Sequence, residues 1–257
     1  MASLFSVVTP VYNSVRFLGE TLDSVAGLQT PHEHIVFDGG STDGTVDLLA
    51  ARDDERLVWV SESDRGQTHA VNKALKRASG ELVGWLNGDD AYIPEAVDRA
   101  LEYLRRQPEV DAVFGGMHVV NEHGAVRRKY QPGRYSWRRY LFLGDYIPTP
   151  SIIFRRRLLE EVGLLDERYA DAADYDFYLR LFHNRLVERL PEALVRFRYH
   201  PESKSASAVA VQLRESLEIR LTWARGPGER ALMRGLDLLK RSVVLRVSPW
   251  RRLYAGG

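Results

Sequence analysis

The sequence predicts an α/β protein with a mainly parallel sheet, helices on both faces and a helical C-terminal tail. The first observation is that short apolar segments typical of buried strands alternate with amphipathic helical segments in the first third of the chain. Parallel strands need crossover connections about as long as a helix, so this alternation favours a parallel sheet. The expected strands are residues 4–9, 34–37, 57–60 and 82–86.

The second observation is that a polar segment follows each of these strands, at residues 9–13, 38–44, 61–67 and 87–90. In open α/β sheets, ligands bind beyond the carboxyl ends of the strands. Four such segments at one edge of the sheet therefore predict a binding site. Their glycines follow neither the G-x-G-x-x-G nor the G-x-x-x-x-G-K-[ST] spacing, which disfavours a dinucleotide dehydrogenase and a P-loop kinase.

The second half of the chain is less regular. Further strands are expected within 112–121, 152–154 and 195–199, and a helix over 172–182. From about residue 207 the pattern is helical, so we divide the chain into a main domain, 1–215, and a basic amphipathic tail, 216–257.

Composition is that of an ordinary globular protein, with 44% hydrophobic and 28% charged residues among 257. The formal net charge of +1 and the lack of a binding motif disfavour a nucleic-acid partner. No cysteine is present, which excludes disulfides and thiol nucleophiles. We find neither a signal peptide nor about 18 consecutive apolar residues. We therefore expect a cytoplasmic location, soluble or peripheral on the inner face of the cytoplasmic membrane.

The first candidate site is the turn from Asn87 to Asp90, which joins a buried strand to a helix opened by Pro94. Two adjacent carboxylates repel each other in a dry site, and a hard divalent cation such as Mg²⁺ or Mn²⁺ relieves that repulsion. Such a cation is commonly shared with substrate phosphates. The alternative is a plain turn in which Asp89 or Asp90 caps the helix.

Asp174 is the second candidate, because Phe177, Tyr178 and Leu181 give the helix a buried face that puts Asp174 near its start. A carboxylate there is a plain N-cap or a general base on a rigid support. His200 follows the last expected strand and is either a surface histidine or a ligand of a metal–diphosphate site.

Two basic segments remain open to interpretation. The stretch 127–139, here called the basic segment, has six Arg or Lys and no acid, and is a solvated loop or a contact for acceptor phosphate or membrane. In the tail, Leu232, Leu236, Leu239, Val243 and Val247 form an apolar stripe. The tail either docks on the enzyme's own core or lies on an anionic membrane surface, where Trp250 and Tyr254 suit an interfacial anchor.

Six motifs in order resemble the inverting nucleotide-sugar glycosyltransferases of family 2. They are VVTPVYN (7–13), FDGGSTDGT (37–45), SESDRGQTHAVNKAL (61–75), GELVGWLNGDD (80–90), TPSIIFRRRLLEEVGLLDE (149–167) and ADYDFYLRL (173–181). The resemblance covers roughly residues 3–205 and implies the GT-A fold, a Rossmann-like sheet with helices on both faces.

The resemblance also implies roles for matching residues. Asp174 matches the catalytic base, and Asp89 and Asp90 match the region that binds Mn²⁺ or Mg²⁺, with His200 as a further metal candidate. The residues that match the nucleotide-sugar site are Thr9, Pro10, Tyr12, Asn13, Asp38, Gln67, Asn72, Asn87 and Asp89.

Two positions depart from the family pattern. Gly39 stands where a second Asp commonly reads the uracil edge, so UDP-, GDP- and dTDP-sugars all stay open. Ala173 stands where Glu often precedes the base.

The sequence thus predicts a metal-dependent inverting glycosyltransferase. It would move a sugar from a nucleoside-diphosphate sugar to a hydroxyl of a glycan or lipid-linked acceptor, in polysaccharide or glycolipid synthesis. A nucleotidyltransferase would need a glycine- and arginine-rich N-terminal loop that is absent here. The alternative from another class is a catalytically silent sugar-nucleotide or glycan-binding module.

Overall fold

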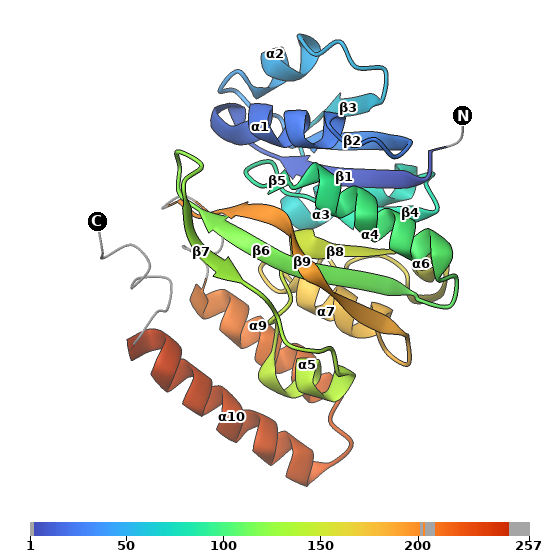
Figure 1. The fold of residues 1–257 in the computed structure, drawn as a ribbon. Helices are drawn as coiled ribbons and strands as arrows, with labels where there is room; N and C mark the ends of the chain where they lie inside the picture. Colours follow the sequence, from blue (N-terminus) through green and yellow to red (C-terminus); the bar gives the residue numbers. More distant parts are fainter. Residues whose placement is uncertain (1–2, 201–202, 204–208, 247–257) are drawn as a thin grey trace.

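The computed structural model describes residues 3–200, 203 and 209–246, and its central feature is one mixed sheet with helices on both faces (Figure 1). The strands are β1 Phe5–Val11, β2 His32–Asp38, β3 Leu57–Ser61, β4 Leu82–Trp85, β5 Ala91–Tyr92, β6 Ala112–Val120, β7 Val126–Tyr130, β8 Ile152–Arg155 and β9 Val187–Arg198. The helices are α1 Val15–Ala26, α2 Thr45–Ala50, α3 Gln67–Arg77, α4 Pro94–Arg106, α5 Trp137–Leu143, η1 Thr149–Ser151, α6 Leu158–Val162, α7 Ala173–Leu181, α9 Val209–Thr222 and α10 Pro227–Arg246.

The strand order in the described sheet is β3-β2-β1-β4-β8-β6-β9-β5, with β7 paired to β6. The first four strands in this order are parallel, as predicted. Beyond β4, β8 is antiparallel to both β4 and β6, β9 is parallel to β6, and β5 is antiparallel to β9. The mainly parallel description therefore applies to the N-terminal part of the sheet.

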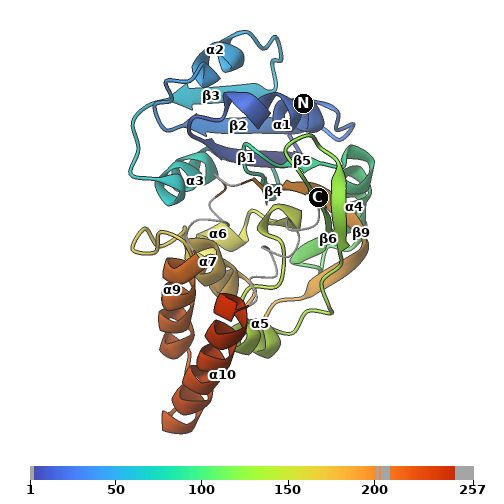
Figure 2. The ribbon, with the colours of Figure 1, turned by 90° about the vertical axis from the view of Figure 1, so that its left-hand side faces the viewer.

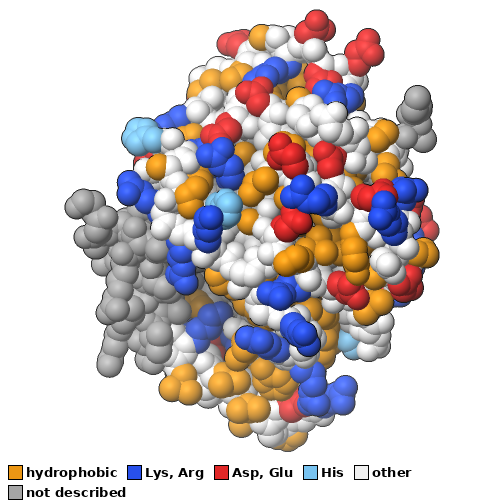
Figure 3. Space-filling model, viewed as in Figure 1, with side chains coloured by type: hydrophobic (Ala, Val, Ile, Leu, Met, Phe, Trp, Pro, Cys, Tyr) orange, Lys and Arg blue, Asp and Glu red, His pale blue; other side chains and the backbone are white. Residues whose placement is uncertain are grey.

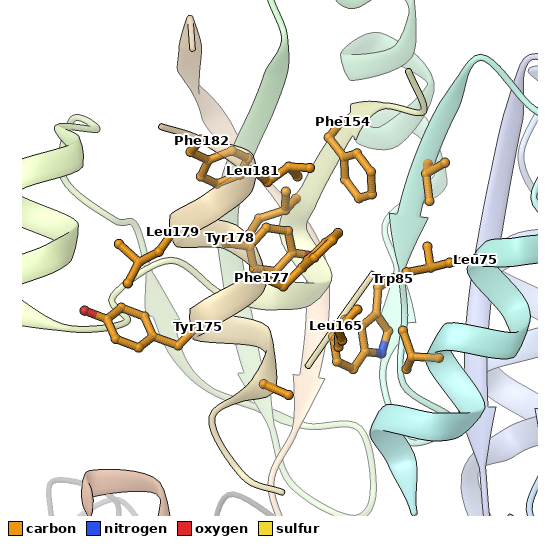
Figure 4. Close-up of a cluster of buried hydrophobic side chains, with 14 of the residues drawn as sticks. Leu75, Trp85, Phe154, Leu165, Tyr175, Phe177, Tyr178, Leu179, Leu181 and Phe182 are labelled. Carbon is orange, nitrogen blue, oxygen red and sulfur yellow. The ribbon is translucent and has the colours of Figure 1, made fainter. Parts of the chain in front are cut away.

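Because successive side chains of a strand point to opposite faces, these apolar strands pack on both faces of the sheet. On one face, Val8 and Val83 pack with α3 and α7, and on the other Phe5 and Leu82 pack with α4. Figure 4 shows the aromatic centre of the first cluster, where Phe177 and Tyr178 of α7 lie against Phe154 of β8. These contacts fix the start of α7 relative to the end of β4.

The first strand is longer than predicted. Pro10 does not end β1, which continues through Val11 and is completely buried. Proline removes one backbone donor, but Pro10 still lies in register with Phe37 of β2. Carrying β1 past the proline places Tyr12 and Asn13 directly at the binding edge of the sheet.

The apolar stripe predicted for the tail is not the buried face of α10. Leu232 and Leu239 are 53% and 64% exposed, whereas Met233 and Asp237 are 0% and 2% exposed. Asp237 turns inward because Arg220 of α9 is buried and needs a counter-charge, which Asp237 Oδ1 supplies at 2.7 Å. The side chain of Val243, and Val247, Trp250 and Tyr254, lie outside the described residues.

The two C-terminal helices form a hairpin beside α5 and α7 (Figure 2). The predicted domain boundary at 215/216 lies inside α9, and the division into two domains stays a prediction. Within the described part of the chain, no helix is both long enough and apolar enough to cross a membrane.

Candidate active site

The loops after β1 and β2 are joined by hydrogen bonds at the binding edge. The Asn13 amide donates to Ser41 Oγ at 2.7 Å, and the Thr42 amide donates to Asn13 Oδ1 at 3.0 Å. Asn13 adopts a φ of 48°, a left-handed conformation that asparagine tolerates better than most residues. Asn13 therefore ties two site loops together, and Tyr12 beside it is 65% exposed.

Asp38 organises the loop after β2 and is only 1% exposed. Its Oδ2 accepts from the Gly40 and Ser41 amides at 3.1 and 3.0 Å and from Ser61 Oγ at 2.6 Å. With its oxygens used in this way, the Asp38 carboxylate shapes the glycine turn. At Gly39 an added Cβ would lie 2.8 Å from a carboxylate oxygen of Asp64, so a side chain here would displace that carboxylate.

Thr9 and Pro10, predicted to line the nucleotide pocket, are buried in β1. Thr9 Oγ1 is 2.9 Å from His34 Nε2 in the interior of the sheet. Burial lowers the pKa of His34 to about 3, so its imidazole is neutral at ordinary pH. In the structure, Thr9 therefore contacts His34 inside the sheet, away from the binding edge.

A pocket of about 100 Å³ lies between the end of β4 and the start of α7. Its described lining consists of Gln67, Thr68, Trp85, Asn87, Thr149, Ala170, Asp171, Ala173, Asp174 and Gln212. Asn87 Oδ1 accepts from Gln67 Nε2 and from Trp85 Nε1, each at 3.0 Å. The pocket thus brings together Gln67, Asn87 and Asp174, which are far apart in the sequence.

Asn72 lies on the same helix as Gln67 but does not line this pocket. It is 5% exposed, and its amide group bonds to both the carbonyl and the amide of Leu165 at 3.0 Å. The structure thus gives Asn72 a packing role, and its expected contact with the nucleotide stays a prediction. Asn72 ties α3 to the segment before α7.

Asp90 is almost completely buried, with 1% exposure. Its Oδ1 accepts from the Arg198 amide at 2.9 Å and its Oδ2 from Asn87 Nδ2 at 3.3 Å. Burial and then the neighbouring charge of Asp89 raise the pKa of Asp90 well above its ordinary value. Both oxygens accept hydrogen bonds from protein donors, so Asp90 supports the turn, and its expected role at a metal stays a prediction.

Asp89 has the more accessible carboxylate, with 28% of its side chain exposed. Its Oδ2 is 3.1 Å from His200 Nε2, and the ring of His200 packs 5.0 Å from that of Phe17. Carboxylate oxygen and imidazole nitrogen are donors that Mn²⁺ accepts. Asp89 and His200 thus offer such donor atoms at this edge, and their binding of a divalent cation stays a prediction.

Asp174 is the second residue of α7, and the N-cap is Ala172, whose side chain makes no capping bond. The Thr149 hydroxyl donates to Asp174 Oδ2 at 3.0 Å, and the Tyr175 amide donates to Oδ1 at 2.8 Å. The aromatic packing of α7 holds the helix rigidly, so Asp174 projects from a fixed support into the pocket. The N-cap interpretation does not hold, and a base remains chemically reasonable.

Sequence reasoning missed three residues at this site. Thr149 holds Asp174, and Gln212 of α9 lines the pocket. Arg198 is 2% exposed, and its guanidinium donates to the carbonyls of Asp89 and Asn121 at 3.1 and 2.9 Å. An arginine within a strand of intermediate burial has no distinctive pattern, so the sequence offered no signal for it.

Comparison with known proteins identifies the class. The family model "Glycosyl transferase family 2" matches residues 6–163, so the chain belongs to that family. An uncharacterised glycosyltransferase of Mycobacterium tuberculosis (strain CDC 1551) is 32% identical over 70% of this chain and 69% of its own length. An uncharacterised protein of M. tuberculosis (strain H37Rv) is 29% identical over 95% of this chain and 73% of its own length. Against two curated relatives from Rickettsia, the chain spans only 35% of their length.

Solved structures show the same fold. S. aureus TarS, crystallised with UDP-GlcNAc, superposes with a TM-score of 0.67 and 22% identity over 91% of this chain and 70% of that one. The mannosyltransferase PcManGT from Pyrobaculum calidifontis, in complex with GDP-Man and Mn²⁺, superposes with a TM-score of 0.65 and 21% identity. The match covers 93% of this chain and 70% of that one. The chain has the GT-A fold that the resemblance implied.

Proposed function

We propose that the chain is a metal-dependent inverting glycosyltransferase that uses a nucleoside-diphosphate sugar. The observation that carries this proposal is the pocket between β4 and α7, which has Asn87 of the carboxylate turn on one wall and Asp174 on the other. A donor bound at the strand ends would present its anomeric carbon between the two. UDP- and GDP-sugars in the related structures support this donor class.

On the donor side, Asp89 and His200 are the residues that would hold Mn²⁺ or Mg²⁺. Bound there, the ion would stabilise the negative charge that develops on the leaving diphosphate. Among the described residues, no group of three or more His, Cys, Asp or Glu side chains is arranged to hold a metal alone. Diphosphate oxygens would therefore complete the coordination, as is common for Mg²⁺ sites. Asp90 and Arg198 would keep the Asp89 turn in place.

On the acceptor side, Asp174 would take the proton of the acceptor hydroxyl. The acceptor oxygen would form a bond to the anomeric carbon as the bond from that carbon to the diphosphate breaks. Because attack would come from the side opposite the leaving group, the anomeric configuration would invert. Thr149 would orient the Asp174 carboxylate for this step.

The acceptor would be a glycan or a lipid-linked sugar. Five cations of the basic segment have no carboxylate within 4.0 Å among the described residues: Arg127, Arg128, Lys129, Arg134 and Arg139. Figure 3 shows Lys and Arg side chains along the side of the molecule that carries β7. Unpaired cations suit the phosphate of a lipid-linked acceptor, and the exposed Leu232 and Leu239 of α10 suit contact with a membrane surface.

The first experiment is a thermal-shift panel with UDP, GDP, dTDP and CMP, each with and without Mn²⁺. A ligand that binds only the folded state raises its apparent stability. We expect one nucleoside diphosphate to raise Tm only with metal, and the corresponding sugar donor to be turned over when an acceptor is present. Asp174→Asn should keep the Tm shift and reduce transfer at least about 10³-fold, since the oriented base is lost.

A silent binding module gives a different pattern. It would show the same Tm shift in wild type and Asp174→Asn, with no turnover by either protein at any acceptor concentration. Weakened donor binding with normal turnover in Asp174→Asn would refute the base assignment.

A further inference from the structure

The helix α9 carries a carboxylate that binds the backbone just before α7. Glu215 Oε1 accepts from the Ala170 amide at 3.0 Å. Its Oε2 accepts from the amides of Asp171 and Ala172 at 2.8 and 2.9 Å. One side chain thus holds three consecutive amides of the loop that leads into α7, here called the entry loop. Asp174 follows two residues after this loop.

Helix α7 lacks a capping box of its own. Its N-cap is Ala172, whose side chain makes no capping bond. In a capping box, the third helical residue is an acid or amide that accepts from the N-cap amide. Here the third residue is Tyr175, whose hydroxyl donates to the carbonyls of Tyr140 and Leu141 at 3.1 and 3.0 Å. Glu215 therefore supplies from α9 the acceptor that a capping box would supply from α7 itself.

Packing fixes α9 next to α7 (Figure 2). Ile219 of α9 is completely buried and lies in the same apolar cluster as Tyr175 and Phe177 of α7. Gln212, Glu215 and Ile219 are spaced by three and four residues, so they share one face of α9. Burial of Ile219 thus turns Glu215 toward the entry loop and Gln212 toward the pocket.

Gln212 adds a polar group to the pocket that contains Asp174. Its side-chain amide is hydrogen-bonded to no described residue, so both its donor and its acceptor are available to a ligand. A sugar suits such a group, because each hydroxyl can donate and accept a hydrogen bond. The other contact of this face of α9 is with the loop before Asp174. The acceptor is therefore the substrate that Gln212 would meet.

We propose that α9 supplies two residues to the acceptor side of the active site. Glu215 is a positioning residue that holds the entry loop and thereby Asp174, and Gln212 binds a hydroxyl of the acceptor sugar. The inference rests on the proposed function, in which Asp174 is the base. A base must lie within hydrogen-bond reach of the proton that it takes, and a small misplacement lowers the rate strongly. The family match ends at residue 163, so neither residue of α9 belongs to the matched segment.

The contact itself is tested without substrate by hydrogen exchange of the full chain, followed by NMR. The three amides that Glu215 binds should exchange slowly in the wild type. In Glu215→Ala they should exchange at least about 10-fold faster, because their acceptor is lost. The matched control is Glu218→Ala, an exposed glutamate on the same helix, which should leave these rates unchanged. Equal rates in wild type and Glu215→Ala would overturn the positioning role.

Steady-state kinetics separate the two roles. We expect Glu215→Ala to lower kcat about 10–100-fold with little change in KM for the donor, because Asp174 is misplaced while the nucleotide loops are intact. Glu215→Gln keeps one acceptor oxygen and should recover part of this loss. Gln212→Leu should raise KM for the acceptor about 3–10-fold, with a smaller change in kcat, as expected for one lost hydrogen bond. Glu218→Ala should match wild type in all three constants.

Several kinetic results would contradict the inference. An unchanged kcat in Glu215→Ala, or a rise in the donor KM as large as the loss of kcat, would overturn the positioning role. An unchanged acceptor KM in Gln212→Leu would overturn the contact with the acceptor. If Glu215→Ala does not fold, as judged by circular dichroism, Glu215→Gln decides. Faster exchange of the entry loop and a lower kcat than wild type would support the role, and wild-type values of both would refute it.

The inference and the proposed function fail in different ways. Absence of transfer by the wild type, or undiminished transfer by Asp174→Asn, would overturn the proposed function and the inference with it. The inference alone is overturned if transfer is lost in Asp174→Asn while Glu215→Ala and Gln212→Leu keep wild-type constants.

Discussion

Two halves of the molecule form the site by different means. In the half proposed to bind the nucleotide, residues 5–92 and here called the nucleotide half, polar side chains hold short loops through bonds to nearby backbone. Asp38 does so for the Gly40 and Ser41 amides. In the half proposed to bind the acceptor, described over residues 137–200 and 209–246 and here called the acceptor half, helices distant in sequence pack through aromatic rings. They are also joined by the buried ion network Arg220–Asp237–Arg241. A short motif is therefore enough to predict a loop held by local bonds. Contacts between helices that are distant in sequence are seen only in the three-dimensional structure.

The largest expected effect is a loss of stability when the buried ion network of the acceptor half is disrupted. Asp237→Ala leaves the buried Arg220 guanidinium without its carboxylate, and we expect a loss of about 3–5 kcal/mol in the free energy of unfolding, measured with urea. The matched control is Glu229→Ala on the same helix. Its carboxylate accepts from the Arg225 amide at 2.8 Å on the surface and lies 3.4 Å from Arg138, whose side chain is 69% exposed. This change should cost less than about 1 kcal/mol.

Equal losses in the two variants would mean that the network does not hold the hairpin in place. A double change, Arg220→Met with Asp237→Leu, should recover most of the lost stability because no buried charge remains unpaired.

A smaller effect is expected in the nucleotide half, where substitutions of Asp89 and Asp90 should change different properties. Asp89→Ala should weaken metal-dependent donor binding about 10–100-fold by calorimetry, with little change in unfolding free energy. Asp90→Ala should instead cost about 1–3 kcal/mol of stability, because the buried Arg198 amide loses its acceptor. The reverse pattern, with Asp90→Ala stable and unable to use metal, would assign the metal to Asp90 in place of Asp89.

The last effect is a pH dependence of stability in the same half. Burial lowers the pKa of folded His34 to about 3, whereas an unfolded histidine titrates near 6.5. The unfolded state therefore binds more protons between these values, so stability should fall as pH drops from about 6.5 toward 3. His34→Gln should remove about 2.5 kcal/mol of the stability loss between pH 7 and pH 4.5, measured by urea unfolding at both pH values. The exposed His123→Gln is the control, and an equal slope in all three proteins would contradict the assignment.

The sequence was sufficient for the strands and site loops of the nucleotide half. Alternation of apolar and polar runs predicted β1 to β4 within a few residues, because burial on both faces demands continuous apolar strands. The placement of Asn87 and Asp174 around one pocket followed from the motifs, and their roles stay predictions.

The tertiary structure decided what each side chain of a motif does. Asp89 and Asp90 are equivalent in the sequence, but pairing of β5 with β9 puts the Arg198 amide on Asp90 and leaves Asp89 toward the edge. Likewise, the buried Arg220 turns Asp237 inward and Leu239 outward, against the apolar stripe of α10. A local pattern records which residues prefer burial, whereas the charge that a buried group must satisfy depends on elements brought beside it by folding.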